Sequence, residues 1–293
     1  MINRSQSPTE TDLTDQVIAS FANAENPRLR QVMQSLVRHL HAFARDVELT
    51  MAEWEHAIGF LTATGQMCDD KRQEFILLSD TLGLSMLVDA INHRSVGGAT
   101  ETTVLGPFYV PPLSIRPADA DLSGGASGTP LNVNAQVQSA DGRPLAGAWV
   151  DVWQSDDDGY YDVQKPGQEE NLRARFMTDA EGRFSFWSIV PVPYPIPTDG
   201  PVGKMLGQVG RHPYRPAHIH FMIGKDGFDT LVTHLFIEGD RYLESDAVFG
   251  VKQQLVVQLK DVDGGWTGSG DRVGPHRRLD HVFGLRPAPD AAS

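Results

Sequence analysis

Two hydrophobic periodicities divide the chain near residue 100. Over the first hundred residues, apolar side chains recur at i, i+3, i+4 and i+7, as they do along one face of an amphipathic helix. The clearest such stripe runs from Leu29 to Ala44. Further helices are expected around residues 50–65 and from about Asp70 to Asn92. The pattern predicts that this part of the chain is helical throughout.

Capping residues mark where these helices begin. Ser7 with Glu10 fits a capping box, and so does Thr50 with Glu53. Asn26 is followed by proline, a residue that is favoured at the first position of a helix. These signals predict three separate helix starts before residue 55.

From about Gly97 onward, glycine and proline become frequent and the hydrophobic period falls to two. Residues 131–138 alternate apolar and polar side chains, which predicts a half-buried strand. Five further strands are predicted, over Ala148–Gln154, Arg183–Ile189, Ala217–Ile223, Thr230–Ile237 and Lys252–Leu259. Short strands at this spacing favour a sandwich of two sheets over a parallel α/β sheet.

The two patterns together predict a mainly β fold with an α-helical N-terminal region. We expect a helical dimerisation or linker region over residues 1–100 and a β-sandwich domain over residues 101–293. In a monomer, the Leu29–Ala44 stripe would expose a long apolar surface to water, which is unfavourable. A homodimer built on these helices is therefore expected.

Composition narrows the class of protein. The chain has 293 residues, with 25 Lys plus Arg against 38 Asp plus Glu, so its net charge is −13. Such a surface repels phosphate backbones, and the sequence has no basic run to offset this, so no nucleic-acid partner is expected. The single cysteine, Cys68, excludes an internal disulfide and a multi-cysteine zinc site. The sequence also has no secretory signal pattern and no apolar stretch long enough to insert in a membrane, so a cytoplasmic location is expected.

A His-x-His pair carries the first sign of chemistry. His218 and His220 fall within a predicted strand, where residues two apart point to the same face. Two imidazoles side by side are a frequent arrangement for metal ligation. The alternative is that both are polar residues on the wet face of an edge strand, and the pair alone does not decide between them.

Further ligands would have to be carboxylates or phenols. Asp156–Asp158 and Glu169–Glu170 offer carboxylates for a two-histidine, one-carboxylate iron(II) site, although the aspartate run precedes a glycine and favours a turn. Tyr161 follows that turn, and Tyr194 lies between two prolines that restrict its backbone. A phenol fixed in this way suits ligation, but a tyrosine that caps the edge of the sandwich would look the same.

The combination of these stretches resembles the intradiol ring-cleaving dioxygenases, and among them the enzymes that act on hydroxyquinol. The resemblance covers nearly the whole chain, and the spaced combination is far more specific than His-x-His alone. The matching stretches are Thr103–Tyr109, Asp151–Tyr161, Arg173–Asp179 and Gly210–His220.

The resemblance implies a metal site and catalytic roles. The metal ligands of the family fall on Tyr161, Tyr194, His218 and His220, which would hold one Fe(III) per chain. Tyr160 stands where relatives often have phenylalanine and is expected to pack. By the same resemblance, Tyr194 leaves the iron when substrate binds, and Arg215 stabilises negative charge on the ring carbon that oxygen attacks.

Substrate choice also follows from the resemblance. The implied substrates are O2 and a small aromatic diol or triol, with hydroxyquinol (benzene-1,2,4-triol) opened to 3-hydroxy-cis,cis-muconate and maleylacetate. The implied pocket residues are Leu77, Asp80, Val104, Leu105, Gly106, Pro107, Phe108, Ile196, Pro197, Arg215 and Val248. Asp80 lies among leucines, where an unpaired carboxylate is costly, so a third substrate hydroxyl is a suitable partner. The alternative for Asp80 is a local helix cap.

Two other functions fit parts of the sequence. A catechol or chlorocatechol 1,2-dioxygenase would share the iron site. A transthyretin-like binding module, which residues 142–152 resemble, would share the sandwich without the iron. His234 stands where catechol enzymes have glutamine, and we expect it to support a ligand without binding the metal. Relatives hold a phospholipid at the helical interface, which the apolar stripes would also permit here.

Overall fold

The computed structural model describes residues 9–69, 72–94, 97–111, 113–165, 167, 170–264 and 274–288. Contacts divide the chain into two compact units, Met1–Ala63 and Thr64–Ser293. A helical dimerisation or linker region over residues 1–100, with a sandwich domain over 101–293, stays a prediction. Among the described helices, none combines the length and the apolar character that crossing a bilayer requires.

The first unit consists of helices, and two of them start at the predicted caps. They are α1 (Glu10–Ser20), α2 (Pro27–Asp46) and most of α3 (Met51–Gln66). The Asn26 carboxamide accepts the backbone N–H groups at the start of α2, and Thr50 and Glu53 cap α3 reciprocally. The capping box of α1 is formed by Thr9 with Asp12. The predicted cap at Ser7 lies outside the described residues.

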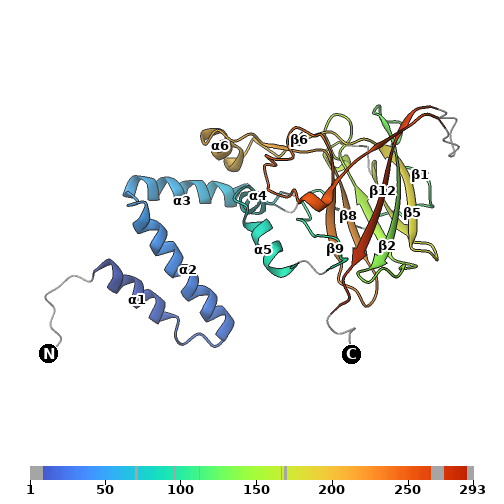
Figure 1. Ribbon diagram of the computed structural model, residues 1–293. Coiled ribbons are helices and arrows are strands. Elements are labelled where there is room, and N and C mark those ends of the chain that lie inside the picture. Colours follow the sequence, from blue (N-terminus) through green and yellow to red (C-terminus); the bar gives the residue numbers. More distant parts are fainter. Residues whose placement is uncertain are drawn as a thin grey trace, which may run out of the picture. The chain divides into compact units, whose positions relative to one another are not determined.

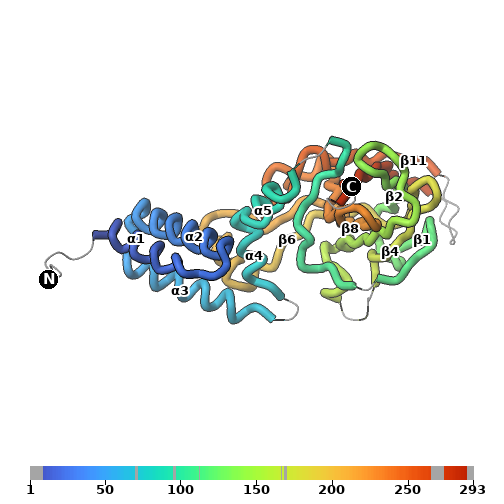
Figure 2. The backbone as a smooth tube through the Cα atoms, turned by 90° about the horizontal axis from the view of Figure 1, so that it is seen from below, coloured from blue at the N-terminus to red at the C-terminus, as the bar shows by residue number. Residues whose placement is uncertain are grey.

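Helix α1 lies against α2, and polar side chains connect the two helices (Figure 1, Figure 2). The Thr14 hydroxyl lies 3.0 Å from His41 Nδ1 and accepts a hydrogen bond from Arg45 at 2.9 Å. The apolar stripe of α2 remains open. Its large side chains are 43–57% exposed at Leu29, Val32, Leu36, Leu40 and Phe43.

Three short helices lie at one end of the second unit, beside the sheets (Figure 1, Figure 2). They are α4 (Glu74–Thr81), α5 (Leu84–Asn92) and α6 (Pro201–Gln208). The prediction of one continuous helix to Asn92 was wrong, because Gly83 adopts a left-handed φ of 73° that breaks it. Its predicted start at Asp70 lies outside the described residues. The break leaves Leu77 and Asp80 on a separate two-turn helix.

The rest of the second unit contains two five-stranded sheets and a short ribbon. One sheet has the order β1-β5-β2-β12-β11, the other β10-β9-β8-β3-β4, and β6 pairs with β7. The strands are β1 (Ala120–Asp121), β2 (Pro130–Ser139), β3 (Trp149–Trp153), β4 (Arg173–Met177), β5 (Arg183–Ile189), β6 (Tyr194–Pro195), β7 (Tyr214–Arg215), β8 (His218–Gly224), β9 (Leu231–Ile237), β10 (Val256–Val257), β11 (Lys260–Val262) and β12 (His276–Leu285). The predicted mainly β fold with an α-helical N-terminal part is confirmed.

Five of the six predicted strands are present as β2, β3, β5, β8 and β9. The prediction over Lys252–Leu259 was wrong: the chain curls into the 3-10 turn η2 (Gln253–Leu255), which buries Leu255, and only β10 is extended. Strand β12 was not predicted, although it lies between β2 and β11. Its polar positions hide the alternation of its buried residues, Leu279, Phe283 and Leu285.

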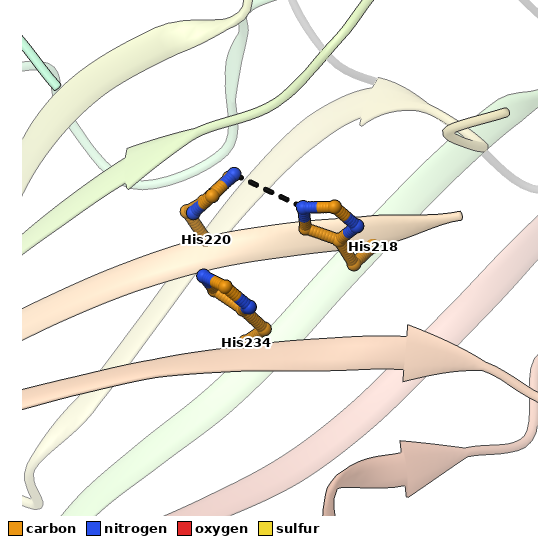
Figure 3. Close-up of side chains that lie close together, drawn as sticks. All are labelled: His218, His220 and His234. Atoms are coloured by element: carbon orange, nitrogen blue, oxygen red, sulfur yellow. Dashed lines mark hydrogen bonds between the residues drawn. The ribbon is translucent and has the colours of Figure 1, made fainter. Parts of the chain in front are cut away.

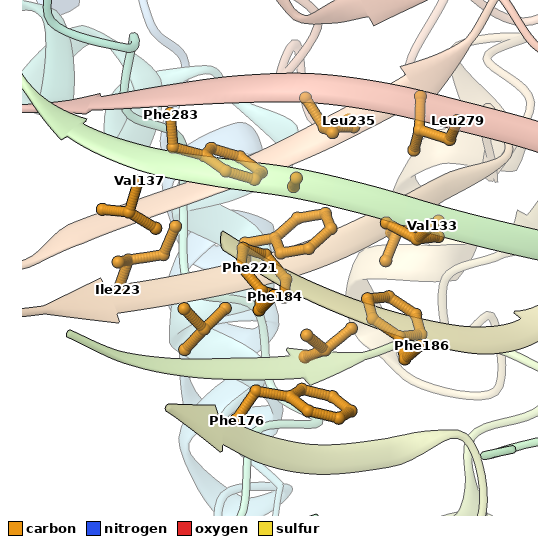
Figure 4. Packing of buried hydrophobic residues seen from close by; sticks show 14 of the residues in the cluster. Val133, Val137, Phe176, Phe184, Phe186, Phe221, Ile223, Leu235, Leu279 and Phe283 are labelled. Carbon is orange, nitrogen blue, oxygen red and sulfur yellow. The ribbon is translucent and has the colours of Figure 1, made fainter. Parts of the chain in front are cut away.

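The hydrophobic core fills the space between the two large sheets (Figure 4). Phe283 of β12 is fully buried and lies 4.8 Å, between ring centroids, from Phe221 of β8. Phe176, Phe184 and Phe186 form a group of three mutually packed rings beside them, with centroids 5.3–6.4 Å apart. These contacts join the sheets into one sandwich, and they fix β8, the strand with the His-x-His pair.

We expect Phe283→Ala to lower the free energy of unfolding by about 3–5 kcal/mol, because it removes a ring from between the sheets and leaves a cavity. Val282→Ala, at the neighbouring half-exposed position of β12, should cost less than about 1 kcal/mol. Urea denaturation of both variants measures the difference. Equal losses would mean that Phe283 does not join the two sheets.

Candidate metal centre

Strand β8 places two histidines outside the sandwich core, at the end of the sheet near the helices. The period of two puts Ile219 and Phe221 into the hydrophobic core and His218 and His220 on the opposite face. Both imidazoles are buried, so they are not on a wet edge. Figure 3 shows them side by side on β8, with His234 next to them on β9.

Two tyrosines reach the same point from loops. Tyr161 ends the loop after β3, where its backbone N–H donates to the Gln164 side chain at 2.9 Å. Tyr194 opens β6, which pairs with β7 so that Tyr194 stands opposite Arg215. Tyr161 is fully buried, whereas Tyr160 is half exposed with the Lys165 ammonium over its ring. Of the adjacent pair, Tyr161 alone faces the histidines.

The polar ends of these four side chains converge. Tyr161 Oη lies 2.7 Å from His220 Nε2 and 3.1 Å from Tyr194 Oη. His218 Nε2 lies 3.1 Å from His220 Nε2 and 3.5 Å from Tyr194 Oη. Donor atoms that bind one first-row metal ion at about 2.0–2.1 Å are separated by similar distances, roughly 2.8–3.4 Å. The four atoms are therefore arranged like a metal-ligand set.

The protonation of the histidines suits metal binding. Burial, reinforced by the nearby Arg215 guanidinium, lowers the pKa of His218 to about 3, and burial lowers the pKa of His220 well below its ordinary value. Both rings are neutral at physiological pH. His218 Nδ1 lies 2.7 Å from the Pro216 carbonyl oxygen, which can only accept, so Nδ1 carries the proton and the Nε2 lone pair points inward.

The phenols need a cation to ionise. Burial raises the pKa of Tyr161 well above 10 and also raises the pKa of Tyr194. A metal ion among the four atoms would reverse this and stabilise the phenolates. Two phenol oxygens with two imidazoles form a donor set that suits a hard, highly charged ion. The residues present thus fit a metal centre.

A second possible ligand set is the cluster of His218, His220 and His234, whose ligating atoms lie within 4.8 Å of one another. It is looser than the set with the two tyrosines. His234 Nδ1 also lies 3.5 Å from Arg215 Nη2. Because a guanidinium can only donate, the lone pair on His234 Nδ1 already accepts from it. The geometry favours His234 as a neighbour of the ligands.

The carboxylates considered as ligands lie elsewhere. Asp156 Oδ1 accepts the backbone N–H groups of Asp158 and Tyr160, as in the predicted turn. Glu170 accepts from the backbone of Ser114. Glu169 lies outside the described residues.

A buried ion pair stands beside the histidines. Arg215 Nη1 lies 3.3 Å from His218 Nε2, and its Nε donates to Asp246 at 3.1 Å. Burial by itself disfavours the charged guanidinium, but Asp246 and the two tyrosines raise the pKa of Arg215 overall. Asp246 in turn accepts the backbone N–H groups of Val248 and Gly250. Asp246 was not predicted as a site residue, because it lies 31 residues from Arg215 in a loop without a motif.

Aromatic rings hold the ligands in place. The Phe108 ring stacks on Tyr161 at 4.4 Å, and Trp153 stacks on His220 at 4.7 Å, both between centroids. The Phe108 carbonyl accepts from Arg173, whose guanidinium also pairs with buried Asp162. Trp153 was not predicted as a site residue, although it stands directly across from His220 in the β3–β8 register.

The predicted pocket residues fall into two groups. Leu77 packs against a cluster that includes Ile196 and Val248. The second group is the 103–108 loop, which is tied to β9 by a hydrogen bond from Thr103 N to Val232 O. In this loop Val104 is half-buried, Gly106 lies against the His220 ring, and Leu105 and Pro107 are exposed. Pro197 is half-buried after Ile196, and no described contact joins it to the ligands.

Asp80 is buried in α4, and its Oδ1 has no hydrogen-bond partner among the described residues. Burial raises the pKa of Asp80, with Ser85 and Arg215 opposing the shift and Asp246 adding to it. Asp80 does not cap α5, whose N-cap is Gly83.

Both the helical part and the sandwich resemble known proteins. Residues 104–283 match the family model described as "Dioxygenase", and residues 26–100 match "Catechol dioxygenase N terminus". The 6-chlorohydroxyquinol 1,2-dioxygenase of Cupriavidus pinatubonensis is 53% identical, over 94% of this chain and 97% of that protein. The hydroxyquinol 1,2-dioxygenase of Nocardioides simplex is 47% identical, over 98% and 99% of the two chains.

A solved structure is also similar to this chain. The hydroxyquinol 1,2-dioxygenase of Pseudomonas putida DLL-E4 superposes with a TM-score of 0.89 at 50% identity, covering 95% of this chain and 99% of that one. The identity and the coverage extend over both the helical part and the sandwich. The chain therefore belongs to the family of intradiol ring-cleavage dioxygenases.

Proposed function

We propose that this enzyme opens the ring of hydroxyquinol between its adjacent hydroxyls, with both atoms of O2 entering the product, 3-hydroxy-cis,cis-muconate or its tautomer maleylacetate. The observation that carries the proposal is the convergence of two phenol oxygens and two imidazole nitrogens within 2.7–3.5 Å beside a buried arginine. The names of the relatives support the substrate.

The metal in this proposal is one Fe(III) per chain, held by Tyr161, Tyr194, His218 and His220. Bound iron(III) would withdraw electron density from a chelated diol and make its ring reactive toward O2. Two phenolates neutralise most of the ionic charge, and the neutral imidazoles complete the donor set without adding charge. Carboxylate ligands are not needed.

One of the two tyrosines would also accept a proton. A diol that binds as a dianion must release two protons, of which one would pass to a phenolate oxygen at hydrogen-bonding distance and the other to the hydroxide that the diol displaces, giving water. Tyr194 is the better placed to leave and accept a proton at Oη, since it sits on the two-residue strand β6. Tyr161 is held by the Phe108 stack and by Gln164. We therefore assign Tyr194 a proton-accepting role and Tyr161 a permanent ligand role.

Arg215 places a fixed positive charge beside the ligands. Its guanidinium is oriented by Asp246 before any substrate arrives, so no reorganisation is required when negative charge develops on the ring. The same pair keeps the site close to neutral, because the buried arginine charge is compensated by a buried carboxylate. Arg215 is thus proposed as the catalytic electrostatic residue.

Substrate choice is assigned to the pocket around α4. Apolar contact with the ring comes from Leu77, Ile196 and Val248, which pack in one cluster. The unpaired Oδ1 of Asp80 is suited to accept a hydrogen bond from the third hydroxyl of hydroxyquinol. The 103–108 loop and Pro197 are proposed to close the remaining walls.

Catechol is the second candidate substrate, because it would chelate the same iron. It leaves Asp80 Oδ1 buried without a hydrogen-bond partner, so the proposed pocket disfavours catechol. A transthyretin-like binding role would account for the sandwich but not for the converging donor atoms.

We also propose that the helical region over residues 1–100 mediates a homodimer. The exposed apolar face of α2 supports this, since a second copy of the same face would cover it. A phospholipid between the helices would fill the same interface.

Replacing Tyr161 by phenylalanine should remove the visible tyrosinate-to-iron absorption or the iron itself. Loss of a ligand should cost more than the roughly 10- to 100-fold in affinity that loss of a hydrogen bond to a ligand costs. Tyr160→Phe is the matched control and should keep both colour and iron. Absorption spectra with iron quantification decide, and the reverse result would move the ligand to Tyr160.

Asp80→Asn should reduce the preference for hydroxyquinol over catechol. A hydrogen bond to a charged group contributes about 1.5–3 kcal/mol, so the ratio of kcat/KM values should fall roughly 10- to 150-fold. The iron colour should remain, because Asp80 is on α4 and the ligands are on β8 and two loops. Equal losses on both substrates would show that Asp80 only supports its helix.

Sedimentation of the purified enzyme at micromolar concentration should show a dimer. Leu36→Glu, which places a charge on the exposed face of α2, should shift it toward monomer, whereas Glu55→Gln on α3 should not. A monomeric wild-type protein would remove the dimer proposal while leaving the metal proposal untouched.

A further inference from the structure

A buried carboxylate joins the pocket helix to the segment that follows Tyr194. Glu74, the first residue of α4, is fully buried. Its Oε2 accepts from Arg72 Nε at 3.0 Å and from Nη2 at 2.9 Å. Its Oε1 accepts the backbone N–H of Val202, in the first turn of α6, at 3.2 Å.

Glu74 caps α6 from a different helix. The N-cap residue of α6 is Gly200, which has no side chain to accept the first free N–H groups. A Cβ on Gly200 would lie 2.3 Å from Glu74 Oε1, so the glycine leaves space for the foreign carboxylate. A negative charge at this end of a helix is also favoured by the helix dipole.

Arg72 extends the same connection to the surface. Its Nη1 and Nη2 donate to the two oxygens of Asp199, both at 2.9 Å, while it holds Glu74 on its other side. The Asp199 hydrogen bonds raise the pKa of Arg72, and Arg72 lowers the pKa of Asp199, so both groups stay charged. Asp199 is 67% exposed and Arg72 27%, so the network runs from solvent to a dry interior.

The hydrogen bonds among Arg72, Glu74 and Asp199 connect two segments that are proposed to line the substrate pocket. Glu74 begins α4, the helix with Leu77 and Asp80, and Arg72 lies two residues before it. Asp199 and Val202 continue the segment that contains Tyr194 and Ile196. Leu77 packs on the cluster that contains Ile196 and Leu206 of α6, so the two walls meet directly where the network ties them.

We propose that Arg72, Glu74 and Asp199 form a latch that sets substrate selectivity, by fixing the distance between Asp80 and the Tyr194–Ile196 segment. The latch residues do not touch substrate and act as positioning residues. The proposal rests on the proposed function, because it assumes that hydroxyquinol lies between these walls.

The test compares Glu74→Gln with Glu181→Gln, an identical substitution in an exposed pair with Arg183 far from the pocket. In Glu74→Gln the kcat/KM ratio for hydroxyquinol over catechol should fall roughly 3- to 30-fold, mainly through a higher KM for hydroxyquinol. Iron content and colour should match those of the wild type. Asp199→Asn, at the exposed end, should shift the ratio in the same direction by less and keep the fold if Glu74→Gln does not.

Hydrogen exchange provides a readout that needs no substrate. The amide of Val202 should exchange roughly 3- to 10-fold faster in Glu74→Gln, because a neutral acceptor replaces a charged one. Unchanged exchange would overturn the cap. Faster exchange with unchanged selectivity in both variants would overturn the selectivity role. A wild-type enzyme that does not cleave hydroxyquinol would refute the proposed function, and the exchange result would then test the cap alone.

Discussion

The structure depends on keeping a set of polar groups dry at the end of a β-sandwich. Tyr161, His218, His220 and His234 are all at most 1% exposed, and burying such groups is costly unless they find partners. Here their partners are mainly one another and the Arg215 guanidinium. The two sheets, the stacked rings of Phe108 and Trp153, and the loops after β3 and β6 all serve to hold this arrangement together.

The buried site also requires that the positive charge of Arg215 be compensated. Arg215 cannot lose its proton, so its burial requires an anion, and Asp246 supplies one. Breaking a buried pair of this kind costs more than an exposed pair, because one charge is left without a partner. The loop that contains Val248, a pocket residue, is folded around Asp246 by backbone hydrogen bonds. One carboxylate therefore compensates the buried arginine beside the candidate metal centre and also folds the loop of Val248, a proposed pocket residue.

Sequence patterns over a few residues correctly predicted features that depend on neighbouring residues, such as the faces of strands and the starts of helices. The period of two placed His218 and His220 on one face of a strand, and the caps at Asn26 and Thr50 start their helices as predicted. The break at Gly83 was missed, because periodicity continues across a single left-handed residue. Strand β12 was missed because its outward charges mask its buried positions. Tyr161 and Tyr194 were proposed as ligands only through the family resemblance, since a tyrosine in a loop has no local signature.

Electrostatic partners that are far apart in the sequence could not be predicted from local patterns. Asp246 is 31 residues from Arg215, and Glu74 is 128 residues from the amide it caps. Both carboxylates act on the segment around Tyr194, one through the β6–β7 pairing that sets Tyr194 opposite Arg215, the other through α6. Tyr194 is the ligand assigned to move, so its surroundings have to stay fixed while it does. Asp246 would do this by holding Arg215 opposite Tyr194, and Glu74 by capping the helix that follows the Tyr194 segment.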